Sequence, residues 1–219
     1  MEYVKICGLK EYDHVQLCID NGASTVGFIY KVPSSPRNLT SIKLKSILSK
    51  IGNKISTVVV LKPTSVPELI EVMNDIPASL FQIHIGFDIK ELDKLSNYRK
   101  NKIILALNVN EANKQLVIDQ INDLKNHFFA FLIDNSEGHG NELEFEIVKE
   151  ILNNTPGARI IVAGGIKVEN VNDIIDVLEP YGIDASSSLE SERGVKDPSK
   201  MKEFLEIIKR RMKNKQENK

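Results

Sequence analysis

The feature of this sequence that most constrains its fold is a regular alternation of short apolar runs with amphipathic segments of helical period. Apolar runs of strand composition occupy residues 4–9, 25–30, 55–61, 80–85, 102–109, 128–133, 159–163 and 183–186. Each is followed by a stretch in which apolar residues recur every three or four positions, at 11–21, 41–51, 66–76, 89–98, 111–125, 144–152, 168–178 and 201–212. This alternation predicts βαβ units and a parallel sheet.

Eight such units fit within 219 residues, which favours an α/β fold with a single (β/α)8 TIM barrel, a closed parallel barrel of eight strands. A doubly wound open sheet is the alternative, because it is built from the same units. No linker or change of composition divides the chain. We therefore expect one barrel domain over residues 1–208 and a basic C-terminal tail over residues 209–219.

The composition argues against several other classes of protein. Lys and Arg number 29 and Asp and Glu number 30, so the chain lacks the basic excess of a nucleic-acid-binding protein. No run of about 18 apolar residues could cross a membrane. Two cysteines do not make a disulfide framework, which favours a reducing, cytoplasmic compartment. The four histidines have no metal-ligand spacing, so we expect no metal.

Polar side chains stand near the predicted carboxyl ends of several strands, where barrels of this kind place their active sites. Cys7 stands near the end of the first run, Asp134 follows the sixth, and Gln82 and His84 alternate along the fourth, so that both point to one face. Each also has a purely structural interpretation, as a small buried hydrophobe, a loop cap or a satisfied interior side chain. Cys18 lies on the apolar stripe of the first helix, and we expect it to fill the core.

The seventh and eighth runs end in residues suited to binding phosphate. Gly164 and Gly165 follow the seventh run, Ser186 ends the eighth, and Ser187 and Ser188 follow it. Glycines let the backbone approach an anion, and a phosphate site at these two loops recurs in this barrel class. No nucleotide-binding glycine motif is present. These residues predict a small phosphorylated substrate and no cofactor.

Taken together, these segments resemble the phosphoribosylanthranilate isomerase family, the tryptophan-pathway (β/α)8 enzymes. The resemblance runs nearly from end to end and in the family's order. The matching segments are VKICGL at 4–9, VGFI at 26–29 with SPR at 35–37, FQIH at 81–84, FLID at 131–134, AGGI at 163–166 with ENV at 169–171, and GIDASS at 182–187 with Glu190 and GVKD at 194–197.

The resemblance implies an Amadori rearrangement that converts N-(5-phosphoribosyl)anthranilate into 1-(2-carboxyphenylamino)-1-deoxyribulose 5-phosphate without a cofactor. It makes Asp134 the acid that protonates the ring oxygen and Cys7 the base that removes the C2′ proton. It assigns Arg37 to the anthranilate carboxylate, for which a planar guanidinium suits well. Gln82 and His84 would bind substrate, and Gly164, Gly165 and Ser186–Ser188 would hold the phosphate. The resemblance does not imply an oligomeric state.

The chain also departs from the family pattern at the periphery of the expected site. The loop after the sixth run reads EGHG at 137–140 in place of a glycine- and threonine-rich sequence, and Ser188 replaces a glycine beside the expected phosphate. Two other functions stay open for this reason. One is a divergent paralogue that isomerises another phosphosugar, although the related histidine-pathway isomerase has an acidic residue where Cys7 stands. The other is a barrel that binds a phosphorylated ligand without turnover.

Overall fold

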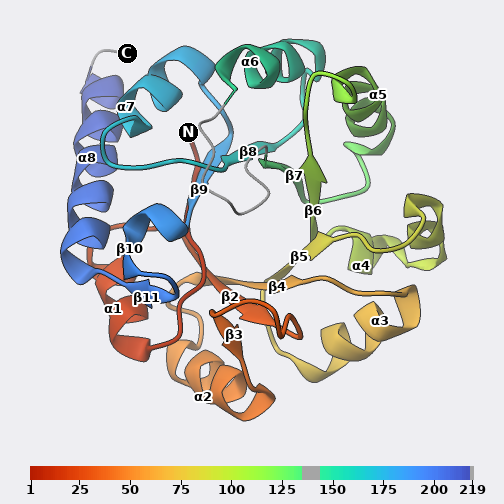
Figure 1. Ribbon diagram of the computed structural model, residues 1–219, viewed down its shortest axis with the longest axis horizontal. Helices are drawn as coiled ribbons and strands as arrows, with labels where there is room; N and C mark the ends of the chain where they lie inside the picture. Colours follow the sequence, from red (N-terminus) through yellow and green to blue (C-terminus); the bar gives the residue numbers. More distant parts are fainter. Residues whose placement is uncertain (135–143, 218–219) are drawn as a thin grey trace.

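Eight parallel strands close into a barrel in the computed structural model, which describes residues 1–134 and 144–217 (Figure 1). Around the ring they follow the order β1, β2, β4, β5, β6, β7, β8 and β9, and β9 pairs again with β1. Their bounds are Tyr3–Ile6, Thr25–Tyr30, Ser56–Leu61, Leu80–His84, Ile103–Asn108, Ala130–Asp134, Ile160–Ala163 and Gly182–Ala185. The predicted (β/α)8 barrel is therefore confirmed, and the open-sheet alternative is excluded.

Helices surround this ring on the outside (Figure 1). The longer ones are α1 (Tyr12–Asp20), α2 (Ser41–Ile51), α3 (Val66–Asp75), α5 (Lys114–Leu124), α6 (Phe145–Asn154) and α8 (Pro198–Glu217). Side chains of Thr40 and Ser65 cap α2 and α3 by accepting hydrogen bonds from the backbone N–H groups of Lys43 and Glu68. Gly52 ends α2 with a φ of 55°, a conformation that favours glycine.

Three helical segments are shorter than the apolar period predicts. The stretch expected as one helix over 89–98 is a 3-10 helix, η1 (Ile89–Lys94), followed by α4 (Asn97–Lys100). The break falls at Leu95 because Ser96 caps a new helix by accepting from Arg99 N. The stretch at 168–178 becomes α7 (Val171–Asp173) and a π-helical turn, η2 (Ile174–Leu178). The helix α5 begins only at Lys114, since hydrogen bonds between Asn110 and Asn113 form a turn before it.

Some elements have no counterpart in the predicted order. A two-residue strand, β3 (Asn38–Leu39), adds to the end of β2. A 3-10 turn, η3 (Ser187–Leu189), leads from β9 into an antiparallel hairpin of β10 (Glu190–Glu192) and β11 (Val195–Lys196). The basic stretch after residue 208 continues α8 as far as Glu217. The division between a barrel domain and a tail stays a prediction.

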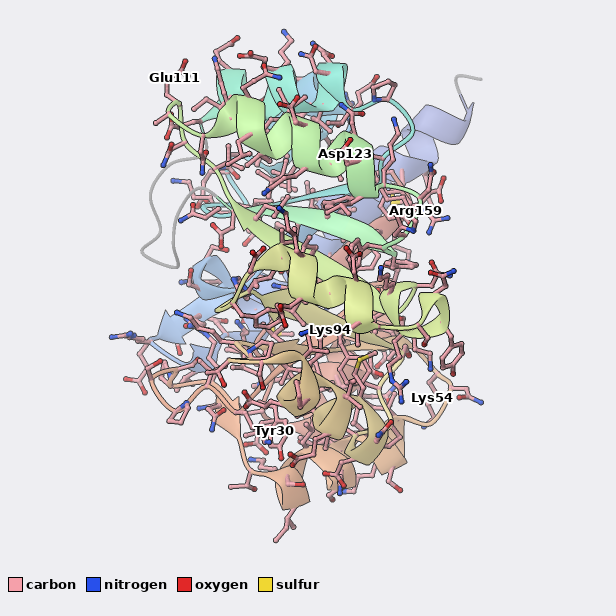
Figure 2. The ribbon with its side chains drawn as sticks, turned by 90° about the vertical axis from the view of Figure 1, so that its right-hand side faces the viewer. Tyr30, Lys54, Lys94, Glu111, Asp123 and Arg159 are labelled. Atoms are coloured by element: carbon pink, nitrogen blue, oxygen red, sulfur yellow. The ribbon has the colours of Figure 1, made fainter. Side chains whose placement is uncertain are left out.

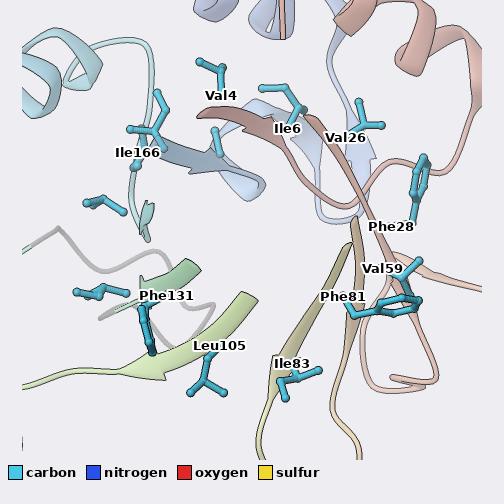
Figure 3. Close-up of a cluster of buried hydrophobic side chains, with 14 of the residues drawn as sticks. Val4, Ile6, Val26, Phe28, Val59, Phe81, Ile83, Leu105, Phe131 and Ile166 are labelled. Carbon is cyan, nitrogen blue, oxygen red and sulfur yellow. The ribbon is translucent and has the colours of Figure 1, made fainter. Parts of the chain in front are cut away.

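The apolar side chains form two clusters separated by the sheet. The larger one fills the space between strands and helices; Figure 3 shows Ile6, Val26, Phe28, Ile83 and Leu105 projecting away from the barrel interior. The smaller one lies within the barrel and includes the alternate strand positions Tyr3, Cys7, Val58, Val60, Leu80, Ile104, Ala130, Leu132, Ile161 and Ala163. Polar side chains inside the ring, notably Lys5, Gln82 and Asp184, are buried with them.

The two ends of the barrel differ in what they carry. In Figure 2, Glu111, which follows the carboxyl end of β6, lies toward the left, whereas Lys54 and Arg159, which precede β4 and β8, lie toward the right. Because all strands of the ring are parallel, every strand ends at the same rim. In the part of the chain that the structure describes, no helix is both long and apolar enough to span a bilayer.

Candidate active site

A cavity of about 540 Å³ opens at the carboxyl ends of the strands. All ten residues singled out from the sequence line it, namely Cys7, Arg37, Gln82, His84, Asp134, Gly164, Gly165, Ser186, Ser187 and Ser188. The cavity wall is mixed, with apolar side chains such as Ile29, Val60 and Leu107 beside these polar groups. The barrel thus gathers residues that lie up to 181 positions apart into one site, counting from Cys7 to Ser188.

Cys7 directly follows β1 and reaches the cavity with only 5% of its surface exposed. Burial raises the pKa of its thiol, while the positive charges of Lys5 and Lys196 act in the opposite direction. The other cysteine, Cys18, is fully buried on α1, as the sequence predicts. Of the two thiols, only the one at the cavity can meet a substrate.

Asp134 is the last residue of β7 and lies half-buried at the same rim. Burial lowers the pKa of the His84 imidazole, and the negative charge of Asp134 acts in the opposite direction without reversing that change. His84 is in turn 3.2 Å from the side-chain nitrogen of Gln82 through its Nε2 atom. A neutral imidazole therefore stands beside the carboxyl group at neutral pH.

Lys5 is a buried charged residue near the site that the sequence did not single out. Its side chain is fully buried inside the barrel, and its Nζ donates to Asp184 Oδ2 at 2.6 Å and to Gln82 Oε1 at 2.8 Å. The sequence could have indicated it, because Lys5 lies within an apolar strand two positions before Cys7 and therefore on the same face. Burial acts to lower the pKa of Lys5, but the Asp184 carboxylate raises it overall, so the ammonium group keeps its charge.

Arg37 enters the cavity from the loop after β2 and is fixed by a carboxylate of the hairpin. Its Nε and Nη2 atoms donate to the two oxygens of Glu190 at 2.6 and 2.7 Å. Glu190 also accepts from Lys196 Nζ at 2.9 Å and from Gly194 N at 2.8 Å. Although burial acts to raise the pKa of Glu190, these donors outweigh it and hold the pKa at about 2. The carboxylate is therefore charged throughout the neutral range.

The predicted phosphate loops meet at one side of the cavity. Gly164 and Gly165 have φ values of 87° and 62°, conformations that favour glycine and that turn the backbone sharply after β8. The Ser188 hydroxyl donates to the carbonyl of Ile166 and so ties the two loops together. Asn170 donates to the Gly165 carbonyl at 2.9 Å and braces the turn from behind. The serine that departs from the family pattern thus has a structural partner.

The loop sequence EGHG at 137–140, which also departs from the family pattern, lies outside the described residues. Within residues 1–134 and 144–217, no group of three or more His, Cys, Asp or Glu side chains is arranged to hold a metal ion.

Comparison with known proteins identifies relatives of the whole chain. A family model described as N-(5'-phosphoribosyl)anthranilate (PRA) isomerase matches residues 4–207. A protein of Sulfurihydrogenibium sp. (strain YO3AOP1), named N-(5'-phosphoribosyl)anthranilate isomerase, is 32% identical over 95% of this chain and 99% of its own length. A protein of the same name from Methanocaldococcus jannaschii is 31% identical over 94% of this chain and 96% of its own.

Solved structures agree on the fold. The phosphoribosyl anthranilate isomerase of Thermotoga maritima superposes with a TM-score of 0.81 at 24% identity, covering 95% of this chain and 99% of the other. A phosphoribosyl anthranilate isomerase solved in complex with reduced 1-(o-carboxyphenylamino)-1-deoxyribulose 5-phosphate gives a TM-score of 0.79, also at 24% identity, with the same coverage.

Proposed function

The chain belongs to the N-(5'-phosphoribosyl)anthranilate isomerase family, and from this premise we propose that Cys7 and Asp134 catalyse its reaction at the barrel rim. The chain is an intramolecular aldose–ketose isomerase of tryptophan biosynthesis. Its reaction rearranges N-(5-phosphoribosyl)anthranilate into 1-(2-carboxyphenylamino)-1-deoxyribulose 5-phosphate. Both are small phosphorylated molecules that also carry an aromatic carboxylate. The single observation that carries the proposal is the meeting of a thiol, a carboxyl group, an arginine and two phosphate-type loops in one cavity.

Asp134 acts first, as the general acid. It donates a proton to the furanose ring oxygen, the C1′–O bond breaks, and the anthranilate nitrogen supplies the electron pair that forms the Schiff base. To act in this way the carboxyl group must hold a proton, which an ordinary aspartic acid loses near pH 4. His84 beside it is uncharged at neutral pH, because burial lowers the pKa of its imidazole, so it adds no positive charge next to the acid.

Cys7 acts second, as the general base. Its thiolate takes the proton from C2′, and the electrons of the C–H bond move toward the iminium nitrogen to give an enolamine. The enolamine becomes the ketone by gaining a proton at C1′ and losing one from the C2′ hydroxyl. The overall change is an isomerisation in which atoms and electrons balance, so one acid and one base are sufficient and no cofactor takes part.

The two ends of the substrate are held by separate groups. Arg37 has its Nε and Nη2 directed to Glu190, which leaves Nη1 and the second Nη2 hydrogen for the anthranilate carboxylate. The backbone of Gly164 and Gly165 with Ser186, Ser187 and Ser188 receives the ribose phosphate. Gln82 and His84 also line the cavity, and we assign them to the ribose.

The compartment also forms part of this proposal. Cys7 and Cys18 are both free thiols, and the established family is biosynthetic, so we assign the chain to the cytoplasm.

A coupled assay tests the proposed function. Phosphoribosylanthranilate is generated in situ, and the loss of its fluorescence is followed after addition of the purified protein. The double variant Cys7→Ala/Asp134→Asn serves as the blank. We expect protein-dependent loss of fluorescence that inorganic phosphate inhibits competitively. If inorganic phosphate raises the melting temperature but no turnover occurs, the site binds phosphorylated ligands without catalysis and the proposal is wrong.

A further inference from the structure

The barrel interior holds a charged group that the proposed mechanism does not yet use. Lys5 is completely buried, and a lysine of this kind persists only when its charge is compensated. Asp184 lies directly beside it on the neighbouring strand, because Lys5 and Asp184 are register partners in the β1–β9 pair. The barrel therefore maintains a buried ion pair whose carboxylate lines the cavity, where apolar side chains would otherwise suffice for packing.

The side chains of Lys5 and Cys7 meet beside Gly27. A β-carbon placed on Gly27 would lie 2.8 Å from Lys5 Cε and 2.9 Å from Cys7 Sγ. Both side chains thus border the same small space beside the Gly27 backbone, and a residue larger than glycine would collide with both. The Lys5 side chain can therefore approach the Cys7 sulfur only because Gly27, on the adjacent strand β2, has no side chain.

We propose that Lys5 is a positioning residue whose ammonium group, held by Asp184 and Gln82, stabilises the thiolate of Cys7 and prepares it to accept the C2′ proton. The inference rests on the proposed function, in which Cys7 is the base. An opposite charge close to an ionisable group favours its charged form, and the effect is strong where water is excluded. Asp184 holds the ammonium group through Oδ2 and keeps the net charge of the buried pair at zero.

Other charged groups near Cys7 also influence the pKa of its thiol. Asp184 on β9 opposes ionisation of the thiol, and Lys196 on β11 favours it. Arg37 and Tyr3 also interact with Cys7 through charge. Among the groups that favour the thiolate, Lys5 acts most strongly. A test must therefore change Lys5 alone and measure the thiol itself.

The first experiment measures the pKa of Cys7 from the pH dependence of its alkylation by iodoacetamide. The variant Lys5→Met removes the charge and keeps a similar length, and Cys7→Ala reports any labelling of Cys18. We expect the pKa of Cys7 to rise by about one unit or more in Lys5→Met. Lys62→Met is the matched control, because it removes an exposed lysine charge at the same cavity; we expect no such rise there.

A second comparison keeps the proposal testable if Lys5→Met does not fold with Asp184 left unpaired. The double variant Lys5→Met/Asp184→Asn contains no unpaired buried charge, and Asp184→Asn alone differs from it only at Lys5. We expect the pKa of Cys7 to be higher in the double variant by about one unit or more. An equal pKa in the folded members of either pair would overturn the proposal.

The activity profile separates this inference from the proposed function. If Cys7 is the base, the acid limb of the kcat/KM profile moves to higher pH together with the thiol pKa in Lys5→Met. A purely structural role for Lys5 would lower activity while both the acid limb and the thiol pKa stay where they are, and that result would overturn the proposal. If the thiol pKa moves while the limb stays, Cys7 is not the base, and the proposed function fails at that residue while the coupling to Lys5 stands.

Discussion

Arg37 and Glu190 form a two-pronged ion pair across 153 residues of sequence, with Nε–Oε1 and Nη2–Oε2 distances of 2.6 and 2.7 Å. The pair joins the loop after β2 to the hairpin after β9, on neighbouring sides of the closed barrel. Lys196 on β11 donates to the same carboxylate. The orientation of the arginine is therefore set by the hairpin before any substrate arrives.

Replacing Arg37 with lysine tests the role of this geometry. Lysine keeps the positive charge but cannot form two parallel hydrogen bonds with Glu190 while presenting a flat face to a carboxylate. We expect KM to rise about tenfold or more, a loss of at least about 1.4 kcal/mol of binding, with kcat changed much less. Steady-state kinetics in the coupled assay measure both constants.

The control for this variant is Lys10→Gln, which removes a positive charge that contacts the same loop through the Pro36 carbonyl. Its KM should match that of the unaltered protein. An unchanged KM in Arg37→Lys would remove Arg37 from the substrate site.

The same carboxylate predicts how stability depends on pH. The folded pKa of Glu190 is held at about 2, below its ordinary value of 4.5. A carboxyl group with a depressed folded pKa stabilises the fold fully above its unfolded pKa, and this contribution is lost as pH falls from about 4.5 to about 2. We expect the difference in free energy of unfolding between the unaltered protein and Glu190→Gln to narrow across this window.

Urea unfolding at several pH values measures that difference. Glu192→Gln is the matched control, because it removes an exposed carboxylate from the same strand. If the difference in free energy of unfolding between the unaltered protein and Glu190→Gln stays constant from neutral pH down to pH 2, the account of this ion pair is wrong.

The two cysteines provide a second matched comparison. Cys7→Ala removes the proposed base at the cavity, and we expect turnover to fall by about 10²-fold or more, the usual effect of losing a general base. Cys18→Ala removes a thiol from the core beneath α1, so it should lower the free energy of unfolding and leave kcat unchanged. Near-normal turnover in Cys7→Ala would disprove the mechanism.

Gly27→Ala tests the close approach of Lys5 and Cys7. Its β-carbon would stand within 3 Å of both side chains, so one of them must move. We expect kcat to fall by about tenfold or more, because small displacements of reacting groups are costly. The coupled assay on the folded fraction measures this effect.

Gly22→Ala is the control for that substitution. Gly22 has open space around it but a φ of 87°, so alanine there strains the backbone far from the cavity. Stability should fall while kcat stays constant. If the two variants behave alike, the space beside Gly27 has no catalytic significance.

Except for Arg37, which only the family resemblance indicated, the positions of the candidate residues were predictable because of one property of parallel barrels. Every strand of the ring ends at the same rim, so a polar residue at a strand end reaches the common cavity without any knowledge of long-range contacts. Cys7, Asp134 and the glycines after β8 were found in this way. The alternation along β5 likewise placed Gln82 and His84 on one face.

The interaction partners of these residues could not be predicted, because they depend on how the barrel closes and on the register between its strands. Lys5 and Asp184 are 179 positions apart and meet only because β9 pairs with β1. Glu190 reaches Arg37 only through the hairpin of β10 and β11, two short strands without a recognisable apolar pattern. The helix predicted over 89–98 was too long, because the spacing of apolar residues does not reveal that Ser96 caps a new helix.

The most direct test of the central claim is the turnover of Asp134→Asn, measured together with its binding of reduced 1-(o-carboxyphenylamino)-1-deoxyribulose 5-phosphate. Asparagine keeps the size of the side chain but cannot donate the proton that opens the ring. We expect binding close to that of the unaltered protein and turnover lower by about 10²-fold or more. Turnover within a few-fold of the unaltered protein, in a variant that binds normally, would contradict the account.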